Sequence, residues 1–264
     1  MAWGWDETLY AGSAAYYASG RLPYPAELAE ALRRELGLDG IGRLLDVGCG
    51  PGSLTLLLGP LFAEAVGIDA DAGMVAEATA RSTANTRCLH MRAEDLPAGL
   101  GAFRVATFAQ SFHWLDQPLV AAAVFELLEP GGAFVHVGAT THQGEGDVPR
   151  DEITALVQAY LGPVRRAGRG EVPHGTRSDE DVAIAAAGFA GPVRIDVPGG
   201  QVHVRTEDDV VASVFSLSSA APHLFGDRLD EFESELRRLL RRESPAGRFS
   251  ERAGEIALRI WTRP

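Results

Sequence analysis

The sequence predicts an α/β fold, a seven-stranded mostly parallel sheet with helices on both faces and a helical lid. Short apolar runs alternate with helical patterns along most of the chain, which is typical of such a sheet. A glycine-rich loop follows the first apolar run and indicates a ligand site at the carboxyl ends of the strands. Two long stretches exceed what the sheet needs, and insertions of this kind usually carry function.

Composition limits the class of protein. With 264 residues, 46% of them hydrophobic, the chain can bury one substantial core. A net charge of −12 argues against a nucleic-acid partner, because binding phosphates requires a basic surface. The two cysteines and seven histidines show no metal-ligand spacing, so no metal site is predicted.

The chain begins with neither the basic region nor the apolar core of a signal peptide, and no apolar run approaches about 18 residues. These observations predict a cytoplasmic protein with no membrane partner, either a monomer or a homodimer. Its expected partner is a small-molecule substrate.

Residues 1–40 are expected to form an N-terminal helical cap, with a helix over 26–36. Tyr17 and Arg21 are four positions apart, so they would share a face if their segment is helical. From spacing alone, we interpret this stretch as a surface segment whose tyrosines cover the edge of the sheet.

The glycine loop follows a predicted strand over 44–47, in the run RLLDVGCGPGS, and precedes a predicted helix over 54–61. Glycines at alternate positions, Gly48 and Gly50 among them, allow a sharp turn with positive φ and let a ligand lie against the backbone. Asp46 precedes the glycines and would repel a pyrophosphate, but it suits a ligand with an ammonium group. The loop therefore predicts a nucleotide-like ligand without a diphosphate.

A second acid supports this prediction. Asp69 follows the apolar run 65–68 and lies 19 positions after Gly50. At a strand tip, such an acid can accept hydrogen bonds from both hydroxyls of a ribose. The G-x-G-x-G spacing differs from the G-x-G-x-x-G of dinucleotide sites, and the chain has no lysine for a Tyr-x-x-x-Lys pair. Both observations disfavour an NAD-dependent dehydrogenase.

The loop resembles motif I of the class I S-adenosylmethionine-dependent methyltransferases, whose sheet is Rossmann-like. The run Y-x-x-x-R-x-P-Y-P at 17–25 is similar to the N-terminal element of a subgroup that includes trans-aconitate and related small-molecule carboxyl methyltransferases. The resemblance covers roughly 16–197 and the last strand. It implies S-adenosylmethionine as cofactor, with S-adenosylhomocysteine as product. It also implies that Arg21 pairs with the methionyl carboxylate, with Tyr17 beside it.

The resemblance extends to the adenine end of the site. Ala70 follows Asp69 in the expected cofactor-binding set. Met74, in a predicted helix over 71–82, falls where the family often has an apolar residue near the adenine, although a core methionine is an equal alternative.

After a predicted strand over 86–91 comes R-A-E-D-L-P, which resembles the family's A-E-D-L-P segment. It implies that the backbone at Ala93 and the side chain of Glu94 or Asp95 bind the adenine edge. The alternative is an acidic surface turn before a proline.

The fourth predicted strand, 103–109, leads into QSFHWLD, which resembles the motif IV region. Gln110 and Trp114 are expected to face the transferring methyl, because ligands lie outside the carboxyl ends of such strands. His113 is the candidate catalytic base for a phenol or alcohol, since an imidazole pKa is close to the working pH. It could instead donate a hydrogen bond to a carboxylate, or serve only in packing. His142, beyond the fifth strand, is the second candidate and, with Trp114, a predicted substrate contact.

The remaining pattern predicts strands over 133–138, 193–197 and 255–261, with helices over 118–128 and 179–187. The predicted cofactor-binding core spans 41–139, 178–198 and 251–264. The predicted lid insertions are 140–177 and 199–250, with helices over 150–161, 207–217 and 227–242.

Together these features predict a methyltransferase that uses S-adenosylmethionine and acts on a small organic molecule. Its substrate site is expected under the lid. O-methylation of a hydroxyl or carboxylate is favoured, with secondary metabolism as the setting. N- or C-methylation remains an alternative, as does a protein of the same fold that binds the cofactor without transferring methyl. Acceptor chemistry resides in lid side chains, so the sequence leaves the acceptor open.

Overall fold

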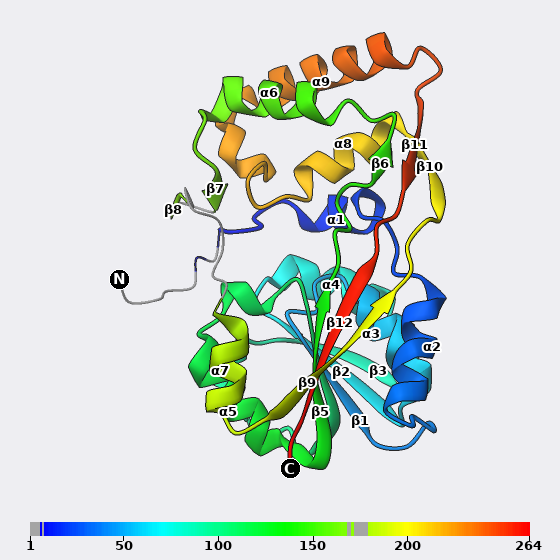
Figure 1. Ribbon diagram of the computed structural model, residues 1–264. Helices are drawn as coiled ribbons and strands as arrows, with labels where there is room; N and C mark the ends of the chain where they lie inside the picture. Colours follow the sequence, from blue (N-terminus) through cyan, green and yellow to red (C-terminus); the bar gives the residue numbers. More distant parts are fainter. Residues whose placement is uncertain (1–5, 7, 168–169, 172–178) are drawn as a thin grey trace.

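The computed structural model describes residues 6, 8–167, 170–171 and 179–264. Parts of the predicted cap (1–40) and of the first insertion (140–177) lie outside these described residues. Figure 1 shows an open sheet flanked by helices, with a second, mainly helical body above the carboxyl ends of the parallel strands. No described helix has the length and apolar character needed to cross a membrane.

The sheet confirms the predicted fold class. Its seven strands run in the order β3-β2-β1-β4-β5-β12-β9. All ladders are parallel except those of β12, which is antiparallel to both of its neighbours. The strands are β1 Arg43–Val47, β2 Glu64–Asp69, β3 Thr86–His90, β4 Phe103–Ala109, β5 Leu128–Gly138, β9 Ala190–Val197 and β12 Ile256–Thr262.

Helices cover both faces of this sheet, as predicted. Leu44 and Leu45 are adjacent in β1 and lie in different apolar clusters, because successive side chains of a strand point to opposite faces. Leu44 packs with α2 and α3, and Leu45 packs with α5 and α7. The flanking elements are α2 Ala26–Glu35, α3 Ser53–Leu58, η1 Gly59–Leu61, α4 Ala72–Ala80, η2 Ala93–Asp95, η3 Phe112–Trp114, α5 Gln117–Leu127 and α7 Glu180–Ala186.

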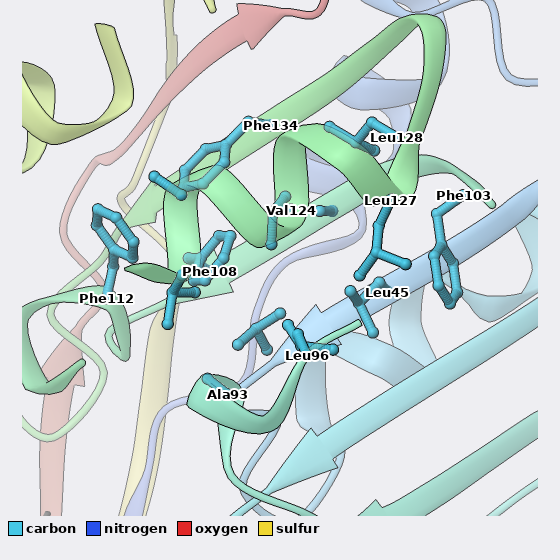
Figure 2. Packing of buried hydrophobic residues seen from close by; sticks show 14 of the residues in the cluster. Leu45, Ala93, Leu96, Phe103, Phe108, Phe112, Val124, Leu127, Leu128 and Phe134 are labelled. Atoms are coloured by element: carbon cyan, nitrogen blue, oxygen red, sulfur yellow. The ribbon is translucent and has the colours of Figure 1, made fainter. Parts of the chain in front are cut away.

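An aromatic cluster fixes the segment that follows β4. The rings of Phe108 and Phe134 stack with centroids 4.4 Å apart, and Phe112 meets Phe108 edge-on at 4.9 Å. Figure 2 shows these three side chains together, next to Val124 of α5. All three phenylalanines are fully buried. Since Phe112 begins η3, this packing positions the two residues that follow it, His113 and Trp114.

The upper body, here called the lid, contains the three predicted helices. They appear as α6 Arg150–Leu161, α8 Glu207–Phe215 and α9 Leu229–Glu243, with η4 Pro222–Arg228 before α9. The lid also has a three-stranded sheet in the order β10-β11-β6, which the sequence did not predict. Its strands are short and polar: β6 Glu145–Gly146, β10 Val202–Thr206 and β11 Arg248–Arg252. A small hairpin pairs β7 Arg166–Ala167 with β8 Gly170–Glu171.

Helix α1, Ala14–Gly20, packs against the lid. Tyr16 packs on Phe215 of α8 with ring centroids 5.0 Å apart. The Ser13 hydroxyl donates to the Phe215 carbonyl at 2.7 Å. A Cβ on Gly20 would lie 2.4 Å from the Ala212 carbonyl oxygen, so the close approach requires glycine. The interpretation of this stretch as a cover for the sheet edge was therefore wrong, because its contacts are with a helix distant in sequence.

A buried carboxylate joins several parts of the lid. Glu251 of β11 is fully buried and accepts hydrogen bonds from Arg150 Nη2 at 2.5 Å and Arg205 Nη1 at 3.2 Å. Arg205 Nη2 also donates to the Gly20 carbonyl at 3.0 Å. This ion cluster connects α1, α6 and the lid sheet.

Candidate functional site

A cavity of about 640 Å³ lies at the carboxyl ends of the central strands. We call it the donor cavity. Its wall contains ten of the predicted site residues: Tyr17, Gly48, Gly50, Asp69, Ala70, Met74, Ala93, Glu94, Gln110 and Trp114. It also contains six residues that the sequence analysis missed: Tyr10, Ile68, Met91, Ala109, Ser111 and Leu115.

The glycine loop forms one wall of this cavity. Gly48 has φ +69°, and a Cβ there would lie 2.4 Å from Cβ of Ser111. The backbone N–H groups of Gly48 and Cys49 both donate to the Ile68 carbonyl, at 2.8 and 3.0 Å. The loop therefore crosses the end of β2 and presents bare backbone to the cavity, as its spacing predicts.

Asp69 ends β2 and faces the cavity across from this loop. Its Oδ2 accepts from the Gly50 N–H at 2.8 Å and its Oδ1 from the Asp71 N–H at 2.9 Å. Burial raises the Asp69 pKa from 3.8 to about 6, so the group is ionised at neutral pH. Each carboxylate oxygen has a second acceptor position. The site can therefore bind a ligand that presents two hydroxyl donors.

Part of the cavity wall is apolar. Met74 is positioned by the N-cap of α4, where its N–H donates to Asp71 Oδ1 at 2.9 Å. Met91 and Leu115 complete this wall together with Ala93. Such a slot suits a flat heteroaromatic ring.

The two acids of the A-E-D segment separate in the structure. Glu94 lines the cavity, and its Oε1 accepts from the Asp116 N–H at 3.1 Å. Asp95 is exposed and lies outside the cavity wall. Of the two alternatives, Glu94 is the residue placed to meet a ligand.

Asp46 lies beneath the loop, outside the cavity wall. It is buried and accepts hydrogen bonds from Thr55 Oγ1 at 2.6 Å and Thr107 Oγ1 at 2.8 Å. Burial raises its pKa. Its carboxylate thus connects β1 to β4 and α3 and supports the loop from below.

An unpartnered donor lies at the cavity wall. The Trp114 indole N–H is buried and has no hydrogen-bond partner among the described residues. The Tyr10 phenol lies near enough to this indole for the indole to influence the pKa of the phenol. The indole N–H and the phenol oxygen nevertheless do not form a hydrogen bond. The Tyr10 and Tyr17 rings lie edge to face, with centroids 6.2 Å apart. A buried N–H without a partner is costly, so this wall suits a ligand with an acceptor atom.

Arg21 reaches the cavity only indirectly. Its guanidinium stacks on the Tyr17 ring, 4.4 Å from the centroid. Its Nε and Nη2 donate to the side chain and carbonyl of Ser216, at 2.9 and 2.7 Å. It therefore joins α1 to the lid behind the tyrosine, and it does not form part of the cavity wall.

Neither of the two candidate histidines belongs to the wall of the donor cavity. His113 lies on η3, and burial lowers its pKa from 6.5 to about 4. His142 lines a second cavity in the lid, and burial lowers its pKa to about 4 as well. Both rings are therefore neutral at physiological pH and able to accept a proton.

The sequence contains only weak signals for the six cavity-wall residues that were not predicted. Ser111 stands between the predicted Gln110 and His113, so the end of strand four could have indicated it. Its hydroxyl donates to the Val47 carbonyl at 2.6 Å. Tyr10 lies before the run at 17–25, and no sequence motif includes it. Its ring reaches the site by packing against Tyr17.

Comparison with known proteins gives a family match for part of the chain. Residues 44–132 match the family model described as "Methyltransferase domain". This segment spans the glycine loop, Asp69, Glu94 and η3. No curated protein matches the chain.

Several solved structures share the fold. The N-methyltransferase NodS from Bradyrhizobium japonicum, crystallised with S-adenosylhomocysteine, has a TM-score of 0.53 at 13% identity, with 97% of this chain and 99% of NodS covered. The YcgJ protein from Bacillus subtilis has a TM-score of 0.51 at 18% identity, covering 89% and 98%. The [4+2]-cyclase SpnF has a TM-score of 0.51 at 18% identity, covering 93% and 85%.

Residues 44–132 thus match a methyltransferase-domain family model, and the sheet order is that of a Rossmann-like fold. They support the predicted S-adenosylmethionine-dependent methyltransferase class and, with it, the predicted cofactor.

Proposed function

We propose that this protein transfers a methyl group from S-adenosylmethionine to a small organic molecule in secondary metabolism, with oxygen of a hydroxyl or carboxylate as the acceptor. The observation that carries the proposal is the donor cavity. One wall offers bare glycine backbone and the Asp69 carboxylate, and the other offers the apolar slot of Met74 and Met91. This combination suits a ribose joined to a flat heterocycle, and the buried indole N–H of Trp114 remains available to a ligand acceptor.

The bound donor supplies an electrophilic methyl on a sulfonium centre, and this chain's own residues hold and enclose it. Asp69 accepts hydrogen bonds from the ribose, and Glu94 is placed at the adenine edge. Tyr10 and Tyr17 cover the cavity from the cap side and limit access of water. Alignment and exclusion of water are the main contributions a protein makes to an in-line displacement.

The preference for a carboxyl or hydroxyl acceptor is supported by the cap. Arg21 belongs to the segment that resembles the carboxyl methyltransferase subgroup, and Ser216 belongs to the lid. The two side chains are hydrogen-bonded, although they lie 195 positions apart. Both segments therefore meet at the boundary between the cavity and the lid.

His113 is proposed as the group that removes the acceptor proton. Burial lowers its pKa to about 4, so the ring is unprotonated at neutral pH but is a weaker base than a free imidazole. We expect His113→Gln to lower the turnover number on a hydroxyl acceptor by about a hundredfold. The affinity for S-adenosylhomocysteine, measured by calorimetry, should stay within about twofold. An unchanged turnover number would assign His113 to packing against Trp114.

Donor affinity should depend on pH through Asp69. The ionised carboxylate accepts the ribose hydroxyls, and its protonation as pH falls removes an acceptor. With a pKa of about 6, affinity for S-adenosylhomocysteine should be about tenfold weaker at about pH 5 than at about pH 7. The Asp69→Asn variant should bind weakly and show a flat profile over this range. An equally steep profile in Asp69→Asn would assign the titration to another group.

The proposed reaction is tested by incubating the protein with S-adenosylmethionine labelled in its methyl group and an extract of small metabolites. A labelled small-molecule product, absent with Asp69→Ala, is the expected result, and mass spectrometry would locate the methyl on O, N or C. Because NodS is named an N-methyltransferase and SpnF a [4+2]-cyclase, the fold alone does not fix the outcome. Donor binding without any labelled product would overturn methyl transfer and leave a cofactor-binding protein.

A further inference from the structure

A second cavity, of about 850 Å³, opens inside the lid. We call it the lid cavity. One side is apolar: Ile153, Val157 and Leu161 project from successive turns of α6, opposite Val214 of α8. The spacing of four residues aligns the α6 side chains along one face of the helix. This side can cover the apolar body of a ligand.

The polar lining of the lid cavity is positively charged. Arg150, Arg165 and Arg166 belong to it, and no Asp or Glu occurs among its described lining residues. The whole chain, by contrast, has 36 acidic residues and 24 basic ones. A cationic cavity within an acidic protein is electrostatically selective for an anion.

The arginines differ in what already neutralises them. Arg150 is paired with the buried Glu251, yet its Nε is buried without a hydrogen-bond partner among the described residues. Arg165 is exposed at the rim, and Arg166 is half-buried, with its Nε donating to the Leu161 carbonyl at 3.3 Å. The guanidinium fork of either rim arginine can bind a carboxylate in a bidentate manner.

His142 lies in the same cavity, and its pKa reflects the positive charge of the lining. Burial is the first cause of its lowered pKa, and the positive charges of Arg21, Arg150 and Arg165 lower it further. Arg165 acts in the same direction on His113. The positive charge therefore lowers the pKa of both candidate histidines, on the side of the lid that faces the sheet.

Arg21 links the two cavities. It stacks on Tyr17, which lines the donor cavity, and it binds Ser216, whose neighbour Leu217 lines the lid cavity. The Tyr17–Arg21 pair therefore lies where the two cavities meet.

We infer that the lid cavity binds the methyl acceptor and that this acceptor is an amphipathic organic acid, with its carboxylate against Arg165 and Arg166 and its apolar body along α6. The inference rests on the proposed function, and it specifies the substrate class. A neutral molecule of the same shape would leave the guanidinium groups without a counter-charge and bind more weakly.

The test is calorimetry on the full chain saturated with S-adenosylhomocysteine, with octanoate and phenylbutanoate as probes and their amides as neutral controls. We expect each acid to bind at least about tenfold more tightly than its amide. The double variant Arg165→Gln/Arg166→Gln should lose this advantage. Val157→Gln should weaken acid and amide alike, because it removes apolar contact only.

Arg242→Gln is the matched control, since Arg242 lies on α9 with 66% of its side chain exposed and pairs with Glu243. It removes one positive charge outside the cavity, where the double variant removes two inside it, and should bind the acids as the unmodified chain does. Equal affinity for acids and amides, no acid binding up to about 5 mM, or equal losses in the double variant and Arg242→Gln would overturn the inference. Failure to bind S-adenosylhomocysteine in the first step would instead overturn the proposed function.

Discussion

Asp69→Ala is expected to weaken binding of S-adenosylhomocysteine by at least a factor of about one hundred. The substitution removes the acceptor of two ribose hydroxyls, and hydrogen bonds to a charged group contribute about 1.5–3 kcal/mol each. It also releases the Gly50 N–H, which Asp69 Oδ2 binds at 2.8 Å. The loop would then lose one of the contacts that hold it in shape for the ligand.

Asp71→Ala is the control for this prediction. Asp71 is the N-cap of α4 and accepts from the Met74 N–H, but its side chain lies outside the cavity wall. Loss of a cap costs about 1 kcal/mol of stability, and we expect donor affinity to change by less than about threefold. Comparable losses in both variants would show that Asp69 acts on local stability and does not bind the ribose.

The second large effect concerns stability. Glu251→Ala is expected to lower the free energy of unfolding by about 3–5 kcal/mol, because it leaves buried cations without a counter-charge. Arg205 is the more affected partner: its side chain is 5% exposed, and burial already lowers its pKa. Since Arg205 also binds the Gly20 carbonyl, α1 should loosen with the lid.

Urea denaturation followed by circular dichroism measures this change. Glu243→Ala is the matched control, because Glu243 pairs with Arg242 on the surface of α9 and such pairs contribute about 0–1 kcal/mol. If Glu251→Ala unfolded within about 1 kcal/mol of Glu243→Ala, the buried cluster would not be a determinant of lid stability.

Much of the sheet could be predicted because its signals are local. The apolar runs, the glycine loop and the acid at Asp69 all fall within one strand–helix–strand unit, where spacing fixes geometry. Helix α6 lies at the predicted residues 150–161, because its amphipathic pattern is uninterrupted and Gly162 ends it.

The lid and cap were predicted less well because their contacts join distant parts of the chain. The resemblance of its sequence neighbours implies that Arg21 pairs with the methionyl carboxylate, and nothing in the sequence indicates its hydrogen bonds to Ser216. The lid sheet pairs Val202–Thr206 with Arg248–Arg252. In the first of these strands the valines are exposed and Arg205 is buried, the reverse of the pattern expected for a half-buried strand. Such pairings appear only when the fold brings the segments together.

Cys49 and Cys88 show the same limit within the core. They are far apart in sequence, but the position of a Cβ on Gly67 is 2.8 Å from the Cys49 sulfur and 3.2 Å from the Cys88 sulfur. The interaction with Cys88, followed by burial, raises the Cys49 pKa well above its usual value. Cys49 is thus a small, buried residue in the loop, and its raised pKa disfavours the thiolate.

The central claim is that the glycine loop and Asp69 bind the adenosyl part of a methyl donor, and a crystal structure of the protein grown with S-adenosylhomocysteine tests it most directly. The account predicts both ribose hydroxyls within hydrogen-bond distance of the Asp69 carboxylate and the adenine ring against Met74 and Met91. A donor cavity without this ligand at saturating concentration, or one that instead binds the diphosphate of a dinucleotide, would contradict it.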